Sequence, residues 1–114
     1  MPEVTAEEAK QKIQSGAHVL DVRTEVEYAA GHIPGARHVP VSDLQREAGG
    51  LSKDQPVILY CRSGNRSGPT ADAFAASGWD AQSIEGGLLA WHEAGLELDP
   101  ADGDVAENPN MPPR

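Results

Sequence analysis

The sequence predicts an α/β protein in which helices cover both faces of a parallel sheet. Short apolar runs, which suit strands buried on both faces, alternate along the chain with segments of helical periodicity. Helix caps and glycine stops separate these segments, and 114 residues leave room for one domain with a single hydrophobic core. In such a sheet, binding sites form beyond the carboxyl ends of the strands.

The first third of the chain contains two helix starts with a strand between them. Residues 5–8 and 24–27 both fit a capping box, in which a threonine and a glutamate satisfy the free amides of a first turn. Gly16 and Gly31 stand where these two helices are expected to end. Residues 18–22 form a short apolar run after a glycine, which predicts a buried strand.

The middle of the chain carries weaker signals. Residues 33–35 are typical of a turn because they combine proline and glycine. Residues 37–41 favour a short strand. Residues 42–45 open a further helical piece, which residues 49–50, both glycine, would end.

Residues 56–60 are the most apolar run of the chain and predict the central strand, directly ahead of Cys61. After a polar loop, Pro69 fits the first turn of a helix that Gly78 would stop. The side chains expected to face inward from this helix are Ala71, Phe74 and Ala75. Cys61 is therefore predicted to lie between a strand and a helix.

Residues 81–85 predict a last strand, and residues 88–91 a last helix that Gly95 closes. We assign residues 1–98 to one domain. Residues 99–114 contain four prolines, four acidic residues and one isolated valine, without helical or strand periodicity. This segment is expected to be an acidic, proline-rich and solvated tail.

Composition limits the classes of partner. The formal net charge of -9 argues against binding to nucleic acid or to an anionic membrane, because both need a basic face. The acidic first ten residues lack the apolar stretch of a signal peptide, and no eighteen apolar residues run together. A lone thiol is better kept in a reducing compartment, so we expect the protein in the cytoplasm.

No cofactor or metal is expected. One cysteine cannot complete a multi-cysteine metal cluster or form an intramolecular disulfide. The histidines show no metal-ligand spacing; they are His18, His32, His38 and His92.

The loop after the central strand carries the candidate site. Its residues are Cys61, Arg62, Ser63, Gly64, Asn65, Arg66 and Ser67. Backbone amides of such a loop can curl around one point near a helix N-terminus and form an anion site. The two guanidinium groups and the helix dipole would favour the thiolate of Cys61 and depress its pKa. A purely structural cysteine is disfavoured, because two arginines would be costly beside an inert apolar side chain.

The sequence resembles the rhodanese family of single-domain sulfurtransferases from about residue 19 to residue 98. Three blocks carry this resemblance: residues 20–23 with 27–28 and 31–36, residues 61–67, and residues 86–87 followed by Trp91 and Gly95. The resemblance implies a three-layer α/β/α sandwich with a mainly parallel five-stranded sheet. It also implies that Cys61 takes the outer sulfur of thiosulfate, releases sulfite and passes the sulfur to a thiol or cyanide. No cofactor is expected for that transfer.

Other residues of the pattern have structural interpretations. Arg62 is similar to the residue of the thiosulfate-using branch, whereas mercaptopyruvate-using relatives usually have glycine there. Asp21 and Arg23 are expected to link the end of a strand to the neighbouring helix. His32 is expected to satisfy backbone groups rather than transfer protons. The two tryptophans are expected to pack against the sheet; they are Trp79 and Trp91.

Two other functions compete. A cysteine phosphatase or arsenate reductase needs cysteine and arginine six positions apart, whereas Arg66 is five positions after Cys61. A rhodanese-like fold can also serve as a docking module or as a persulfide relay to a protein partner. Docking alone is the weaker hypothesis because Cys61 and both loop arginines are present. The expected partners are a small anionic sulfur donor and a thiol, cyanide or protein sulfur acceptor.

Overall fold

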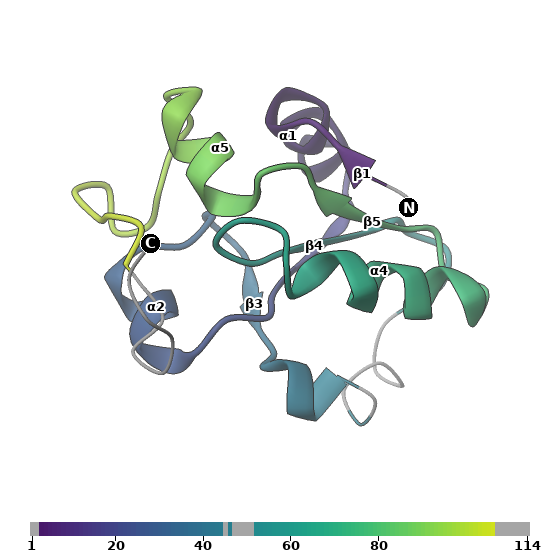
Figure 1. The fold of residues 1–114 in the computed structure, drawn as a ribbon. Helices are drawn as coiled ribbons and strands as arrows, with labels where there is room; N and C mark the ends of the chain where they lie inside the picture. The colour runs from purple at the N-terminus through teal and green to yellow at the C-terminus, as the bar shows by residue number, and fades with distance from the viewer. Residues whose placement is uncertain (1–2, 45, 47–51, 107–114) are drawn as a thin grey trace.

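A five-stranded parallel sheet forms the centre of the protein (Figure 1). The computed structural model describes residues 3–44, 46 and 52–106. The strands are β1 (Glu3–Val4), β2 (His18–Asp21), β3 (Arg37–His38), β4 (Val57–Tyr60) and β5 (Ala81–Ile84). Their order across the sheet is β1-β5-β4-β2-β3, and every neighbouring pair is parallel. The predicted fold class is confirmed, and the structure adds the strand order.

Helices cover both faces of this sheet. They are α1 (Ala6–Gln14), α2 (Glu25–Ala30), α4 (Ser67–Ala76) and α5 (Gly87–Glu93), with a 3-10 turn η1 at Val41–Asp43. In Figure 1, α1 and α5 lie together on one side of the strands and α4 lies on the other. Across residues 3–44, 46 and 52–106, no helix is both long and apolar enough to cross a membrane.

The central strand β4 separates two hydrophobic clusters. Its residues are fully buried and alternate between the faces, with Ile58 and Tyr60 in one cluster and Val57 and Leu59 in the other. This alternation follows from the pleat of a strand, in which successive side chains point to opposite faces. The prediction of a central strand ahead of Cys61 is confirmed.

Both predicted capping boxes are formed. The Thr5 hydroxyl accepts a hydrogen bond from the Glu8 amide at 3.2 Å, and the Thr24 hydroxyl accepts one from the Glu27 amide at 3.4 Å. Each glutamate carboxylate in turn accepts from the amide of its threonine. Gly31 ends α2 as predicted, with φ 170°, an extended conformation that any residue adopts.

Two other local predictions need correction, and a third is untested. The strand expected over residues 37–41 extends only over Arg37–His38, because η1 begins at Val41. Ala75 is exposed rather than inward-facing, whereas Ala71 and Phe74 are buried as predicted. The predicted end of the helical piece at residues 49–50 lies outside the described residues.

The segment from residue 99 to residue 106 docks on the end of α2, although a solvated extension was expected (Figure 1, yellow). His32 and Asp99 exchange two backbone hydrogen bonds of 3.1 and 2.8 Å, and the Asp104 amide donates to the Ala30 carbonyl at 3.0 Å. A Cβ atom on Gly31 would lie 2.5 Å from the Asp104 carbonyl oxygen. The close approach of these two backbones therefore requires glycine here. The domain division at residue 98 stays a prediction.

Candidate active site

Cys61 lies at the carboxyl end of β4, where the chain leaves the sheet for the loop that leads to α4. It is fully buried. The first turn of α5 holds the start of this loop, since the Leu88 amide donates to the Cys61 carbonyl at 2.9 Å and the Leu89 amide to the Arg62 carbonyl at 3.1 Å. Gly87 permits this approach: it has φ +59°, and a Cβ there would lie 2.5 Å from the Cys61 carbonyl oxygen.

Three hydrogen-bond donors converge on the sulfur atom of Cys61. The amides of Gly64 and Arg66 lie 3.0 and 3.3 Å from Sγ, and the Ser67 hydroxyl lies 3.5 Å from it. Gly64 has φ +100°, a left-handed conformation that turns the loop around the sulfur. The anion nest predicted from the loop composition is therefore present.

These donors control the ionisation of the thiol. Burial raises the pKa of the Cys61 thiol, but hydrogen bonds from Ser67 and from the amides of Arg66 and Gly64 outweigh it, so the pKa is lowered. The predicted direction is confirmed. The expected cause needs correction, because the main favourable contributions come from hydrogen bonds and not from the two guanidinium groups.

Ser67 connects the sulfur to the sheet. Its hydroxyl is buried at the start of α4 and lies 2.7 Å from the hydroxyl of Ser83 on β5. Either hydroxyl can donate in this pair, and when Ser67 donates to Sγ its oxygen accepts from Ser83. Ser83 was not identified from the sequence. It could have been noticed as a hydroxyl residue within a predicted buried strand, residues 81–85.

The two loop arginines have different environments. The Arg66 guanidinium forms two hydrogen bonds of 2.9 Å to the two carboxylate oxygens of Glu27. Its pKa is raised, chiefly by this carboxylate and further by Cys61. In contrast, Arg62 Nε is buried and has no hydrogen-bond partner among the described residues. Arg62 as a whole is half-buried and forms no ion pair with the described residues, so its guanidinium is available to a ligand.

Glu27 was identified in the sequence only as a capping residue and as part of the family pattern. It is fully buried, and burial raises its pKa, but hydrogen bonds from Arg66 and Thr24 outweigh this effect and lower the pKa. The signal in the sequence was the second capping box itself, which places a carboxylate at a helix start near the carboxyl ends of the strands.

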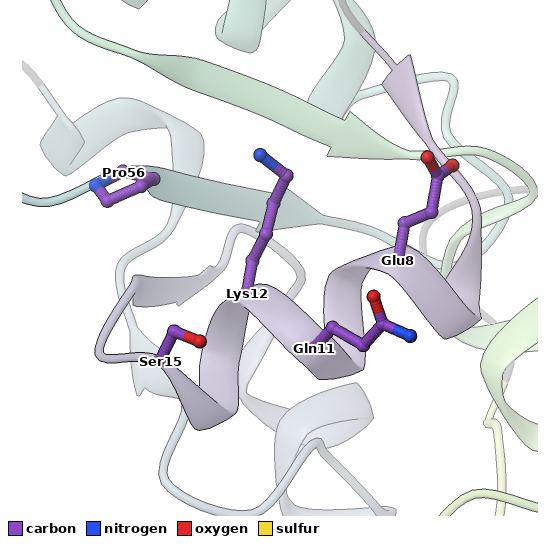
Figure 2. A pocket seen from close by; sticks show the side chains of 5 residues that line it. All are labelled: Glu8, Gln11, Lys12, Ser15 and Pro56. Carbon is purple, nitrogen blue, oxygen red and sulfur yellow. The ribbon is translucent and has the colours of Figure 1, made fainter.

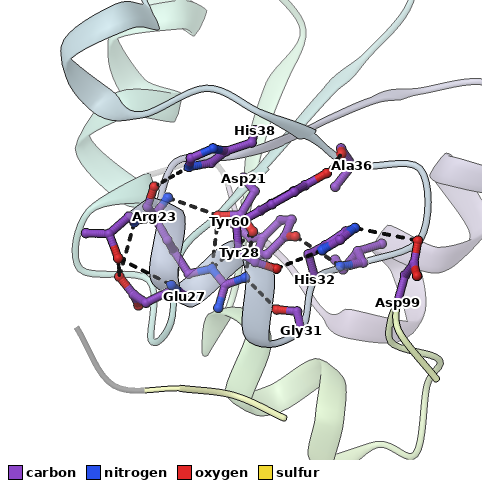
Figure 3. A network of polar contacts seen from close by, with 12 residues as sticks. Asp21, Arg23, Glu27, Tyr28, Gly31, His32, Ala36, His38, Tyr60 and Asp99 are labelled. Carbon is purple, nitrogen blue, oxygen red and sulfur yellow. Dashed lines mark hydrogen bonds and ion pairs between the residues drawn. The ribbon is translucent and has the colours of Figure 1, made fainter. Parts of the chain in front are cut away.

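A buried polar network supports the site from the side of α2 (Figure 3). Arg23 donates to Asp21 Oδ2 at 2.6 Å and to the Gly31 carbonyl at 2.7 Å, and neither Arg23 nor Asp21 is exposed by more than 1%. The pair thus links the end of β2 to the end of α2, as predicted. The Arg23 guanidinium also lies 5.5 Å from the centre of the Tyr60 ring.

The histidines near this network bind backbone groups. His32 Nδ1 lies 2.8 Å from the Tyr28 carbonyl, as expected for a backbone-satisfying residue, and its ring stacks on Tyr28 at 3.8 Å. His38 Nε2 lies 2.7 Å from the carbonyl of Arg23. Among the described residues, no group of three or more His, Cys, Asp or Glu could hold a metal ion.

The remaining predicted residues lie at the rim of the loop. Ser63 is half-buried and Asn65 is exposed. Trp91 is buried against the sheet as predicted, and Trp79 is half-buried against Phe74. The loop residues are contiguous, and the structure gathers Gly64, Arg66 and Ser67 around the sulfur, whereas Arg62 Nε has no partner in the part of the chain that the structure describes.

A polar pocket of about 260 Å³ lies between α1 and the start of β4 (Figure 2). It is lined by Glu8, Gln11, Lys12, Ser15 and Pro56. Pro56 precedes β4 whereas Cys61 follows it, so this pocket lies at the opposite end of the strand from residues 61–67, the nucleophilic loop.

Comparison with known proteins identifies relatives along most of the chain. Residues 5–94 match the model of the rhodanese-like domain family. The chain is 32% identical to the thiosulfate sulfurtransferase GlpE of Pseudomonas paraeruginosa, over 91% of this chain and 92% of that protein. It is 35% identical to the putative sulfur carrier protein YrkF of Bacillus subtilis, over 69% of this chain and 44% of that protein.

A solved structure shares the fold. The rhodanese-related protein from Thermoplasma volcanium superimposes with a TM-score of 0.79 and 28% sequence identity, covering 86% of this chain and 97% of that one.

Proposed function

Since the chain belongs to the rhodanese-like domain family of sulfurtransferases and sulfur carriers, we propose that it transfers the outer sulfur of thiosulfate through a persulfide on Cys61. The observation that carries this proposal is the convergence of three donors on Cys61 Sγ. A thiolate held in this way is a ready nucleophile. The same donors can bind the terminal sulfur of a persulfide, which is also anionic.

The proposed reaction has two steps. In the first, the Cys61 thiolate attacks the outer sulfur of thiosulfate; a new S–S bond forms, the S–S bond of thiosulfate breaks, and sulfite leaves with its electron pair. In the second, a thiolate or cyanide attacks the outer persulfide sulfur, and the Cys61 thiolate leaves. Charge and atoms balance in both steps, so neither needs an oxidant or a cofactor.

The loop from Arg62 to Ser67 is the proposed substrate-binding element. The Arg62 side chain has an unpaired buried donor and is the proposed partner of the sulfonate end of the donor molecule. Ser63 and Asn65 lie at the rim, where they can bind the same oxygens. Gly64, Arg66 and Ser67 bind the reacting sulfur atoms.

Thiosulfate is proposed as donor because GlpE, with which the chain shares 32% identity, is a thiosulfate sulfurtransferase. A persulfide relay to a protein acceptor is the second candidate, favoured by the likeness to the putative sulfur carrier YrkF. We propose the reducing cytoplasm as the location, since the chain has one cysteine and that cysteine must stay reduced. Phosphoryl transfer is disfavoured because the loop is one residue short of a phosphate-binding ring.

Steady-state kinetics with thiosulfate and cyanide test this proposal. Since sulfite leaves before the acceptor reacts, double-reciprocal plots at several cyanide concentrations should give parallel lines. The Cys61→Ser variant should fold and lose turnover entirely. Intersecting lines, or turnover in the Ser variant, would contradict the covalent mechanism. Turnover with protein thiols alone would favour the relay.

A further inference from the structure

The partner of Arg66 is a buried carboxylate that comes from a distant part of the chain. Glu27 lies on α2, 39 residues before Arg66, and its side chain has no exposed surface. Both of its oxygens accept from the guanidinium at 2.9 Å. Bidentate pairs of this kind orient the guanidinium and also neutralise its charge.

The other end of Arg66 contacts the nucleophile. Its backbone amide donates to Cys61 Sγ at 3.3 Å, and its carbonyl accepts from the Thr70 hydroxyl at 2.9 Å inside α4. Arg66 is thus held at its guanidinium by Glu27 and at its carbonyl by α4. Both contacts restrain the residue whose amide points at Cys61 Sγ.

We propose that Glu27 is a positioning residue of the nucleophilic loop, which holds Arg66 so that the Arg66 amide stays directed at Cys61 Sγ. The proposal deepens the proposed function, because the positioned sulfur is the one that would carry the persulfide. It also reassigns Arg66: its charge is neutralised by Glu27, so Arg62 is the loop cation left to bind an anionic donor.

The charges around Arg66 support this assignment. The groups that act on it electrostatically are Glu27, Cys61 and Asp21, and Asp21 is itself paired with Arg23. The carboxylates of Asp21 and Glu27 balance the guanidiniums of Arg23 and Arg66. The negative charges of the thiolate and of a bound anion are therefore stabilised by the directed amides and by Arg62.

The two capping boxes of the protein provide a matched experiment. Glu8 and Glu27 occupy the same position in their boxes and both bind their capping threonine, but Glu8 is exposed on α1, whereas Glu27 is buried and also binds Arg66. Glutamine preserves a capping box. Glu27→Gln therefore keeps the cap and removes the negative charge and one acceptor from Arg66. Glu8→Gln makes the same change where no arginine is bound.

The readout is the rate at which iodoacetamide alkylates Cys61 as a function of pH, which requires no sulfur donor. If Glu27 positions the loop, Glu27→Gln should raise the Cys61 pKa by about one unit, which means about tenfold less thiolate at a pH below both values. If Glu27 acted only as a nearby negative charge, its neutralisation would lower that pKa, and this result would overturn the proposal. An unchanged profile would overturn it as well. Glu8→Gln should leave the profile as in the wild type.

A double-variant cycle gives a second criterion. Because Glu27 acts through Arg66, adding Glu27→Gln to Arg66→Gln should change the alkylation profile little beyond Arg66→Gln alone, whereas additive changes would contradict the proposal. Arg66→Gln alone must raise the pKa, and if Glu27→Gln does not fold, an unchanged Arg66→Gln profile would overturn the proposal. If Glu27→Gln alters the alkylation profile as expected but the wild-type protein transfers no sulfur, the proposed function is refuted. The role of Glu27 in positioning the loop then still holds.

Discussion

The Ser67 hydroxyl is the side-chain donor to Cys61 Sγ, and its removal should measurably weaken the nucleophile. In the folded protein this hydroxyl provides the largest of the effects that lower the Cys61 pKa, after burial, which raises it. Ser67→Ala should therefore raise the pKa of the thiol. Ser83, which lies 2.7 Å from Ser67, loses its acceptor in the same variant.

The size of the effect follows from the hydrogen bond. A bond to a charged group contributes about 1.5 to 3 kcal/mol, and one pKa unit corresponds to about 1.36 kcal/mol. The separation of 3.5 Å between Oγ and Sγ is long, so we expect the lower end of this range. The predicted rise is about one unit, or about tenfold slower alkylation at a pH below both values.

The assay is the pH dependence of alkylation by iodoacetamide, measured for wild type, Ser67→Ala and the double variant Ser67→Ala/Ser83→Ala. The double variant removes the unpaired Ser83 hydroxyl, which separates a loss of stability from the change in ionisation. Ser63→Ala is the control, because Ser63 lies in the same loop and is not among the described donors to Sγ. A Ser67→Ala profile equal to that of wild type would refute this account of how the thiolate is stabilised.

Three further predictions concern the anion site, the docked segment and acid stability. Arg62→Met should reduce kcat/KM for thiosulfate by about ten- to a hundredfold, mainly by raising KM. It should change the thiol pKa less than Ser67→Ala does. An unchanged KM would refute the assignment of Arg62 as the residue that binds the anionic donor. Gly31→Ala should destabilise the protein by about 1 to 3 kcal/mol in urea denaturation, because the added Cβ would lie 2.5 Å from the Asp104 carbonyl oxygen. A variant as stable as wild type would show that residues 99–106 do not dock on α2. The lowered pKa of Glu27 means that its stabilising contribution is complete above the ordinary glutamate pKa of about 4.3 and disappears as the pH falls through the lower folded value. Glu27→Gln should therefore lose stability less steeply than wild type over that acidic range, and parallel losses would contradict the pairing.

Local signals allowed most elements to be predicted. The capping boxes at Thr5 and Thr24 depend on four consecutive residues, and β4 on a run of apolar side chains, so both were visible in the sequence. Strand order was not visible, because it depends on which helices pack on which face. Gly31 was identified as a helix end, but its close contact with Asp104 involves backbone atoms, which composition does not encode.

In the candidate site, too, local features were predictable and contacts between distant segments were not. The nest around Cys61 was predictable because its donors come from the next six residues. The pairing of Arg66 with Glu27 was not, because 39 residues separate them and only the fold brings α2 beside the loop. The sequence accordingly predicted a lowered thiol pKa but attributed it to the helix dipole and to two guanidinium charges, one of which is neutralised by Glu27.

The central claim is that Cys61 carries the transferred sulfur, and intact-protein mass spectrometry after incubation with thiosulfate tests it most directly. The account predicts that the wild-type mass increases by one sulfur atom, that dithiothreitol removes the addition, and that Cys61→Ser shows none. A wild-type protein whose mass stays unchanged while it releases sulfite from thiosulfate, or a Cys61→Ser variant that still gains sulfur, would contradict it.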